Sequence, residues 1–215
     1  MNVVSNHGMK KGTCFLVCAG ERVPLQFTPC EGDFVIAVDG GAEYLDECGK
    51  SADLYLGDFD SLGCIPNGEN VIELNPVKDE TDLFAAAEEG LRRGYRVFRI
   101  YCALGGRTSH LIGNLHALCH LFRMGADAKI IGNHSELFFI RHIARFQKGG
   151  YLSLVPLDGG AAVLIENCKY SGEIHLTTAD SLGVSNEPLE GACVTVLSGE
   201  VLAIVEETDR ANEIK

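Results

Sequence analysis

Residues 54–61 read Leu54-Tyr55-Leu56-Gly57-Asp58-Phe59-Asp60-Ser61, so a short apolar segment is followed at once by two carboxylates. An apolar run of this length, bounded by polar residues, is typical of a buried β-strand. Polar or glycine residues also follow a predicted strand or open a predicted helix at Asp39-Gly40-Gly41, Lys78-Asp79-Glu80-Thr81-Asp82 and Gly105-Gly106-Arg107. In open α/β sheets, ligands bind beyond the carboxyl ends of the strands. The pattern therefore predicts metal and phosphate chemistry at one edge of a sheet.

The composition excludes several classes of protein. The chain has 215 residues, 46% of them hydrophobic, which allows a core of ordinary size. Its net charge of −12 provides no basic surface for nucleic acid or an anionic membrane. No apolar run reaches the ~20 residues that span a bilayer, and the first residues lack a signal-peptide pattern. We therefore expect a cytoplasmic protein that binds neither nucleic acid nor a membrane.

The nine cysteines include no C-x-x-C pair, which argues against a structural zinc site. Several lie inside apolar segments, where a free cysteine behaves as a small buried hydrophobe. This usage favours free thiols in a reducing compartment.

The chain changes its pattern near Gly149. Before it, short apolar runs alternate with helix-like segments, which predicts βαβ units and a parallel sheet. The strands expected there are 14–18, 34–38, 54–56, 71–74, 97–102 and 128–131, and the clearest helices are 80–93 and 109–124. After it, the segments are short, β-branched and separated by turn residues, which predicts an antiparallel sandwich or small barrel. The strands expected there are 151–155, 162–165, 173–176, 193–197 and 201–205.

The acidic residues suit a metal site. Asp58 and Asp60 can point the same way because alternate residues of a strand share a face. Hard divalent cations such as Mg²⁺ prefer carboxylate oxygens and bridge them to substrate phosphates. Asp79 and Asp82 add two acids at the start of the helix expected over 80–93. The alternative for all four is a local role in Asx turns and helix caps.

The glycine pair before Arg107 suits an anion. Gly105 and Gly106 let the backbone approach a ligand closely, and the helix that follows offers free N–H groups. Arg107 is a bidentate donor to phosphate, and no Walker lysine follows it. His110 and Asn114 lie one turn apart on that helix, so both could face the same crevice, although a structural role for His110 is also open.

Taken in order, these motifs and the downstream segment Gly183-Val184-Ser185-Asn186-Glu187 resemble the thiamine pyrophosphokinase family over roughly residues 14–205. The resemblance implies an α/β fold: a Rossmann-like parallel-sheet domain over 1–146 that binds ATP, and an antiparallel β-sandwich over 147–215 that binds thiamine. It also implies a homodimer whose active sites lie between subunits. The implied reaction transfers pyrophosphate from ATP to the thiamine hydroxyl, giving thiamine diphosphate and AMP with Mg²⁺.

The resemblance also implies roles for individual residues. Those that would hold Mg²⁺ and the triphosphate are Asp58, Asp60, Asp79 and Asp82, with Arg107 beside them in catalysis. Those that would line the ATP site are Asp39, Gly40, Lys78, Thr81, Gly105, Gly106 and Asn114, and those that would contact thiamine are Ser185 and Asn186. The attacking group is the hydroxyl of the substrate, so charge stabilisation matters more than a nucleophilic side chain.

Ser109 departs from the family pattern, which usually has an acid just before His110. Serine can replace aspartate as a helix cap but not as a charged ligand or base. Three hypotheses follow: a thiamine pyrophosphokinase, a pyrophosphokinase for another heterocyclic alcohol such as a hydroxymethylpterin, and a catalytically weak thiamine or nucleotide binder. Ser185 and Asn186 favour thiamine over a pterin.

Overall fold

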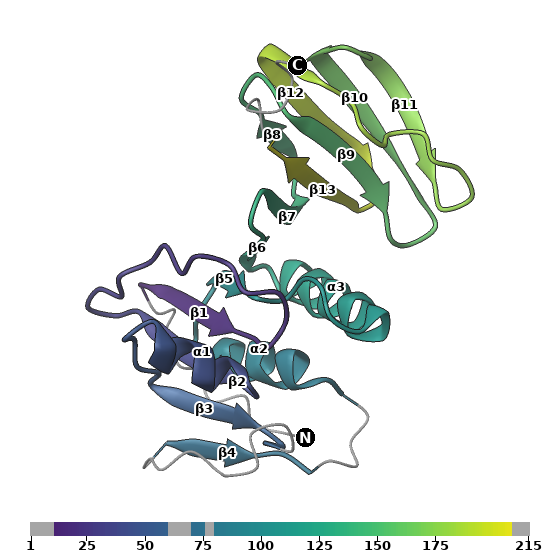
Figure 1. Cartoon of the computed structure of the whole chain (residues 1–215). Helices are drawn as coiled ribbons and strands as arrows, with labels where there is room; N and C mark the ends of the chain where they lie inside the picture. The colour runs from purple at the N-terminus through teal and green to yellow at the C-terminus, as the bar shows by residue number, and fades with distance from the viewer. Residues whose placement is uncertain (1–10, 60–69, 76–79, 208–215) are drawn as a thin grey trace. The chain divides into compact units, whose positions relative to one another are not determined.

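The computed structural model describes residues 11–59, 70–75 and 80–207. The chain divides into two compact units, Met1–Asn133 and His134–Lys215 (Figure 1). Each unit is described by itself below.

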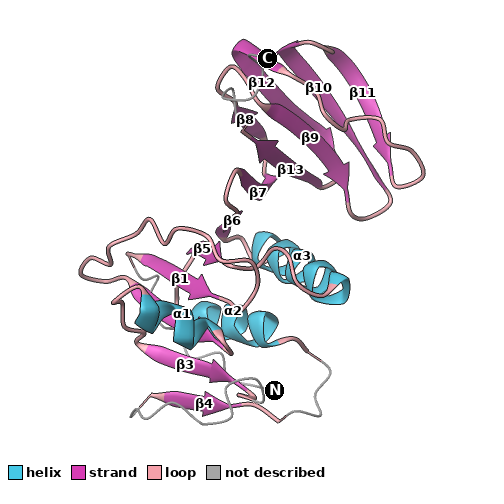
Figure 2. Ribbon diagram, in the orientation of Figure 1, coloured by secondary structure: helices cyan, strands magenta, loops and turns pink. Residues whose placement is uncertain are grey.

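The first unit is a parallel sheet with helices on both faces (Figure 2). Its strands are β1 (Thr13–Val17), β2 (Phe34–Val38), β3 (Leu54–Gly57), β4 (Val71–Glu73), β5 (Val97–Tyr101) and β6 (Asp127–Ile131). Its helices are α1 (Gly41–Glu47), α2 (Asp82–Arg92) and α3 (Thr108–Arg123). The strand order is β4-β3-β2-β1-β5-β6, and every pairing in this series is parallel. The predicted Rossmann-like α/β fold is confirmed.

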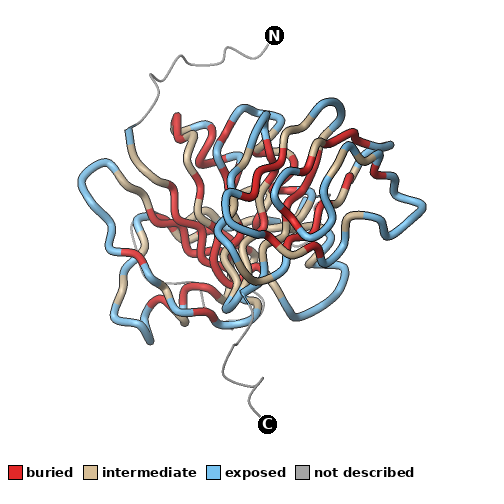
Figure 3. The backbone as a smooth tube through the Cα atoms, turned by 90° about the horizontal axis from the view of Figure 1, so that it is seen from above, coloured by how far each residue is buried: buried red, intermediate tan, exposed pale blue. Residues whose placement is uncertain are grey.

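Alternate residues of β1 face opposite helices. Phe15 and Val17 lie in one core cluster with Ala42 and Leu45 of α1. Cys14 faces α2 instead: a Cβ added at Gly90 of α2 would lie 3.1 Å from the sulfur of Cys14. Both faces of the strand are therefore covered, which explains why its residues form a continuous apolar run. Figure 3 shows the buried and exposed stretches of the chain, and residues 14–17 of β1 and 35–38 of β2 are among the buried ones.

The second unit is an antiparallel sandwich. Its strands are β7 (Ser135–Ile140), β8 (Ile143–Arg145), β9 (Tyr151–Pro156), β10 (Gly160–Cys168), β11 (Gly172–Thr177), β12 (Pro188–Ser198) and β13 (Val201–Glu206). One layer has the order β7-β13-β9 and the other β11-β10-β12-β8. Leu152 and Leu154 of β9 share a buried cluster with Val163 and Ile165 of β10, so the core lies between the layers.

The second unit begins earlier than the predicted boundary between residues 146 and 147. Strands β7 and β8 precede that boundary, yet β7 pairs with β13 and β8 pairs with β12. The compact unit therefore starts at His134. The long-range pairing of β7 and β8 cannot be read from the local pattern, since short apolar runs look alike in both units.

The helices also differ in detail from the prediction. Helix α1 was not predicted, because it covers only seven residues directly after Asp39-Gly40. Helix α2 starts at Asp82, two residues later than expected, because Thr81 is its N-cap.

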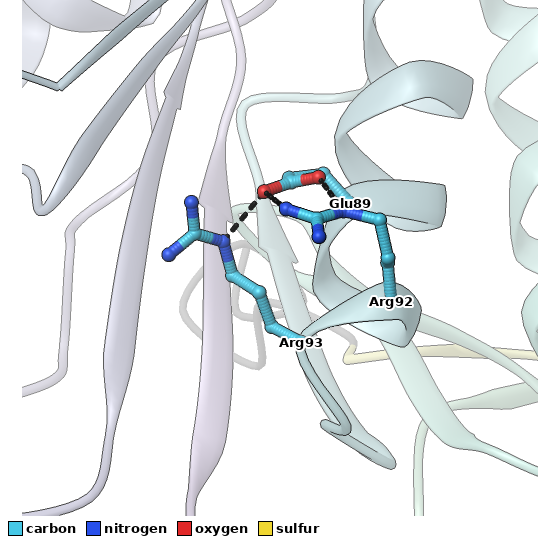
Figure 4. A network of polar contacts seen from close by, with 3 residues as sticks. All are labelled: Glu89, Arg92 and Arg93. Atoms are coloured by element: carbon cyan, nitrogen blue, oxygen red, sulfur yellow. Dashed lines mark hydrogen bonds and ion pairs between the residues drawn. The ribbon is translucent and has the colours of Figure 1, made fainter. Parts of the chain in front are cut away.

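Glu89 is the buried centre of an ion-pair network at the carboxyl end of α2 (Figure 4). The side chain of Glu89 is only 10% exposed and accepts hydrogen bonds from Arg92 Nε at 2.7 Å and Arg93 Nε at 2.6 Å. The Arg93 guanidinium lies 4.6 Å from the centroid of the Phe34 ring, which ties the network to β2. Positive side chains at this end also complement the helix dipole.

We expect Glu89→Gln to lower the free energy of unfolding at pH 7 by about 2 kcal/mol, the value of a charge-assisted hydrogen bond. Burial raises the pKa of the Glu89 carboxyl, but the hydrogen bonds from Arg92 and Arg93 outweigh it and the net pKa is lowered. A carboxyl with a lowered pKa stabilises the fold above its unfolded-state pKa of about 4.3. That stabilisation is lost as the pH falls through the folded-state value.

The difference in urea-unfolding free energy between wild type and Glu89→Gln should therefore shrink as the pH is lowered below about 4. A difference that stays constant from pH 7 to pH 3 would contradict the role of the charged carboxylate.

Candidate active site

The carboxyl edge of the first sheet contains a switch in strand order. Strands β2, β3 and β4 follow one another on one side of β1, whereas β5 and β6 lie on its other side. Open parallel sheets bind ligands beyond the carboxyl ends of the strands at such a switch point. The segments that follow β1 and β5 therefore flank the expected crevice.

The backbone is strained at three of these strand ends. Asp39 after β2, Phe59 after β3 and Cys102 after β5 have positive φ angles of 49°, 56° and 56°. Residues other than glycine rarely adopt this left-handed conformation, and it clusters at ligand sites. The sheet thus stores strain at the edge where the polar motifs lie.

Asp39 and Asp58 extend from neighbouring strand ends. The N–H of Asp39 donates to the carbonyl of Leu56 at 2.9 Å. A Cβ placed on Gly57 would lie only 2.9 Å from the Cα of Asp39. Glycine at 57 is therefore required for the backbone after β3 to pass Asp39, and Asp58 follows immediately.

Asp82 comes to the same region from α2. The thiol of Cys18, just after β1, is buried, and burial is the main cause of its raised pKa. The thiol of Cys102 and the carboxylates of Asp82 and Asp39 raise that pKa further. Asp82 is the first residue of α2, and Asp39 directly follows β2.

Thr81 has a structural role at the start of α2. Its Oγ1 accepts a hydrogen bond from the N–H of Phe84 at 3.3 Å, as an N-cap does. A Cβ on Gly113 of α3 would lie 2.9 Å from the Thr81 methyl group, so α3 packs directly against this cap. The predicted ATP contact of Thr81 stays a prediction.

The loop after β5 presents the glycine pair and the start of α3. Gly105 and Gly106 have φ angles of 73° and 69°, which glycine adopts without steric cost. Arg107 is the N-cap residue of α3, is exposed, and contacts the ring of His110 one turn later. Asn114 donates from Nδ2 to the carbonyl of Ala103 at 2.7 Å, so it fastens this loop to α3.

Gly20 and Glu21, after β1, border the same loop and were not predicted from the sequence. Their N–H groups donate to the carbonyls of Cys102 at 2.8 Å and Leu104 at 2.7 Å. The available signal was a glycine directly after a buried apolar run, the same signal that marks the other strand ends.

In the second unit, Ser185 and Asn186 lie beside β9. Ser185 is exposed, has a positive φ of 58°, and donates its N–H to Ser153 Oγ at 3.0 Å. Asn186 is only 4% exposed, and its amide bonds the backbone of Tyr170, with Nδ2 to O at 2.7 Å and N to Oδ1 at 3.0 Å. Asn186 therefore shapes the turn, whereas Ser185 is the exposed residue of the pair.

Several predicted residues lie outside the described ranges: Asp60, Lys78 and Asp79. Within residues 11–59, 70–75 and 80–207, His, Cys, Asp and Glu side chains nowhere gather in threes as a metal site would require. Asp58 and Asp82 nevertheless supply the carboxylate oxygens that suit Mg²⁺. The four-carboxylate metal set stays a prediction.

The comparisons with known proteins agree with this geometry. Residues 30–130 match the family described as thiamin pyrophosphokinase, catalytic domain. Thiamine pyrophosphokinase of Bacillus subtilis (strain 168) is 25% identical over 187 residues, which cover 81% of this chain and 87% of that protein. Over residues 30–130 the chain thus resembles the catalytic domain of thiamine pyrophosphokinases. These relatives are enzymes by name, which supports an enzyme.

Solved thiamine pyrophosphokinases share the fold. The crystal structure from Bacillus subtilis has a TM-score of 0.79 at 22% identity and covers 92% of this chain and 99% of that one. The one from Geobacillus thermodenitrificans has a TM-score of 0.77 at 23% identity with the same coverage. The structure from Candida albicans has a TM-score of 0.73 at 14% identity and covers 92% and 89%. At such identities the likeness supports the fold alone.

Among the helices that the structure describes, each is too short or too polar to cross a lipid bilayer.

Proposed function

We propose that this protein transfers pyrophosphate from ATP to the hydroxyl of thiamine, forming thiamine diphosphate and AMP. The observation that carries the proposal is the match of residues 30–130 to the catalytic domain, in which Asp39 and Asp58 follow neighbouring strands and Asp82 opens α2. Transfer of this kind requires mainly positioning and charge stabilisation. Carboxylates and a glycine-rich loop at the carboxyl ends of the strands would meet both requirements once a divalent cation is bound.

Within the proposal, the acids and the loop have separate tasks. Asp58 and Asp82, with Asp60 and Asp79, hold Mg²⁺, which when bound offsets the charge that develops on the phosphates. Arg107 and the backbone of Gly105 and Gly106 hold the triphosphate. These groups hold the reacting phosphorus in line with the incoming hydroxyl. Asp39, Gly40, Lys78, Thr81 and Asn114 line the remainder of the ATP site.

Ser185 is the proposed thiamine contact in the second unit, with Asn186 acting through the turn that it stabilises. We further propose that the chain works as a homodimer with its active sites between subunits, in the cytoplasm. The free thiols of the described cysteines support a reducing compartment. A sedimentation measurement that gives one monomer mass would overturn the dimer.

The test of the function is formation of AMP and thiamine diphosphate from ATP, thiamine and Mg²⁺. Equal amounts of both products, absent when thiamine or Mg²⁺ is omitted, are the expected result. Thiamine binding without AMP would favour the weak binder. AMP formation with a hydroxymethylpterin in preference to thiamine would favour the other acceptor alcohol.

Ser109 is the position that motivates the weak-binder alternative. It is exposed in the first turn of α3, and that turn contains no acidic residue. We expect Ser109→Asp to increase the rate of AMP formation, because a carboxylate there adds an acid next to Arg107. An acid at a helix start should also stabilise the fold by about 0.5 kcal/mol. A stability gain with an unchanged or lower rate would show that chemistry does not require an acid at this position.

A further inference from the structure

The segment after β1 continues the pairing of β1 with β5 beyond the ends of both strands. The N–H of Cys18 donates to the carbonyl of Tyr101 at 3.0 Å, and the bonds from Gly20 and Glu21 to Cys102 and Leu104 follow. A Cβ on Gly20 would lie 2.5 Å from the carbonyl oxygens of both Cys102 and Leu104. Only glycine therefore allows this approach. The backbone of the loop after β5 is held along one side by the segment after β1.

The side chain of Glu21 extends this contact to the glycine pair. A Cβ on Gly105 would lie 2.9 Å from the Cβ of Glu21, so Glu21 packs directly on Gly105. Its Oε1 accepts a hydrogen bond from Asn133 Nδ2 at 3.0 Å, and Asn133 follows β6. The next residue, Arg22, lies over the Tyr44 ring at 5.0 Å and pairs with Glu47 of α1. Glu21 thus links the ends of β1, β5 and β6.

Gly105 and Gly106 need such a support. A glycine pair loses more backbone entropy on ordering than any other pair, and neither residue has a side chain that could anchor it. A loop that must present N–H groups to an anion binds it more tightly when it is ordered beforehand. Asn114 of α3 supports the loop through its hydrogen bond to Ala103, and Glu21 supports it from the segment after β1.

We propose that Glu21, held by Asn133, is a positioning residue that sets the backbone of Gly105–Arg107 against the phosphates of the nucleotide. This inference rests on the proposed ATP-dependent function. The carboxylate does not itself contact the nucleotide; its task is to accept the hydrogen bond from Asn133 that holds the Cβ and backbone of Glu21 against Gly105. The negative charge of Glu21 is dispensable for this task, because a glutamine keeps both the length and the acceptor oxygen.

The kinetic test compares Glu21→Ala, Glu21→Gln and Asn133→Ala in the full chain. We expect Glu21→Ala to raise the KM for ATP about fivefold with kcat changed less than about twofold, the pattern of lost ground-state binding. Glu21→Gln should restore the wild-type KM. Asn133→Ala should reproduce the effect of Glu21→Ala, and the double variant should add little, because both remove the same contact.

Glu31→Ala is the matched control. Glu31 is an exposed acid in the same connection between β1 and β2, but it lies near Asp33, whose carboxylate accepts from Thr13 at the amino end of β1. Glu31→Ala should leave the KM for ATP unchanged. An equal rise in KM for Glu31→Ala and Glu21→Ala would overturn the positioning role, because general loss of acidic charge would then explain the effect.

Hydrogen exchange of the backbone amides of Gly105–Arg107, measured without nucleotide, separates this inference from the proposed function. Faster exchange in Glu21→Ala but not in Glu21→Gln is the expected result. Unchanged exchange together with an unchanged KM in Glu21→Ala would overturn the positioning role. Absence of AMP formation by the wild-type protein would instead contradict the proposed function, whatever the exchange rates show.

Discussion

Asp58→Ala should lower the rate of AMP formation by several orders of magnitude, because in the proposed function it removes a carboxylate that would hold the metal at the reacting phosphates. The expected loss of stability is below about 1 kcal/mol, since Asp58 is part-buried beyond the end of β3 and outside the core clusters. The measurement combines AMP formation at saturating ATP and thiamine with the midpoint of thermal unfolding.

Asp53→Ala is the matched control, because Asp53 precedes the same strand at its amino end. Its Oδ2 accepts a hydrogen bond from the N–H of Val35 at 2.8 Å. Its loss should therefore cost about 1 kcal/mol of stability and leave turnover near that of the wild type. Asp58→Ala should thus lower turnover with little loss of stability, whereas Asp53→Ala should lower stability with little loss of turnover. Near-normal turnover in Asp58→Ala would remove Asp58 from the site.

Gly41→Ala should destabilise the first unit by at least about 3 kcal/mol, although helix propensity alone predicts a gain of about 1 kcal/mol. The reason is that a Cβ at Gly41 would overlap the carbonyl oxygen of Val17, which is backbone and cannot turn aside. The first turn of α1 would have to move away from β1 and take the strained residue Asp39 with it. Urea unfolding followed by circular dichroism measures the change.

Gly49→Ala provides the comparison for a glycine that is needed for its conformation alone. Gly49 has a φ of 64° and open space where a Cβ would stand. Its replacement should cost about 1 kcal/mol, the strain of a left-handed residue. A Gly41→Ala protein that is as stable as the wild type would show that α1 does not press on β1 as described.

The sequence predicted the strands of the first unit to within one or two residues, and the reason is physical. Each is a short apolar run whose two faces are buried, bounded by Gly, Asp or Asn, so its signal is local. Helix α1 was missed because seven residues directly after a strand end contain too few turns to establish a period. Strands β7 and β8 were not predicted as strands, and their residues fell in the first predicted domain, because their pairing partners are far away in the chain.

Some residues of the candidate site could likewise be predicted from local signals, whereas the roles of others depend on contacts with distant residues. Asp39, Asp58, Asp82 and the glycine pair were predicted as site residues from their position after or before an element, which is a local signal. Asn186 was predicted as a thiamine contact, but its amide bonds the backbone of Tyr170, and only the fold reveals such a partner. Glu21 was missed because its contacts, Gly105 and Asn133, are both distant in the sequence.

By itself the sequence determined the class of each unit and the chemical character of the strand ends, because hydrophobic period and turn residues act over a few neighbours. Only the tertiary structure decided which strand ends lie next to one another. The order β4-β3-β2-β1-β5-β6 is set by hydrogen bonds between distant segments, and it brings Asp39 beside Gly57 and Glu21 beside Gly105. Their proximity is a property of the packed sheet, since contacts between distant residues form only when the intervening chain has been ordered.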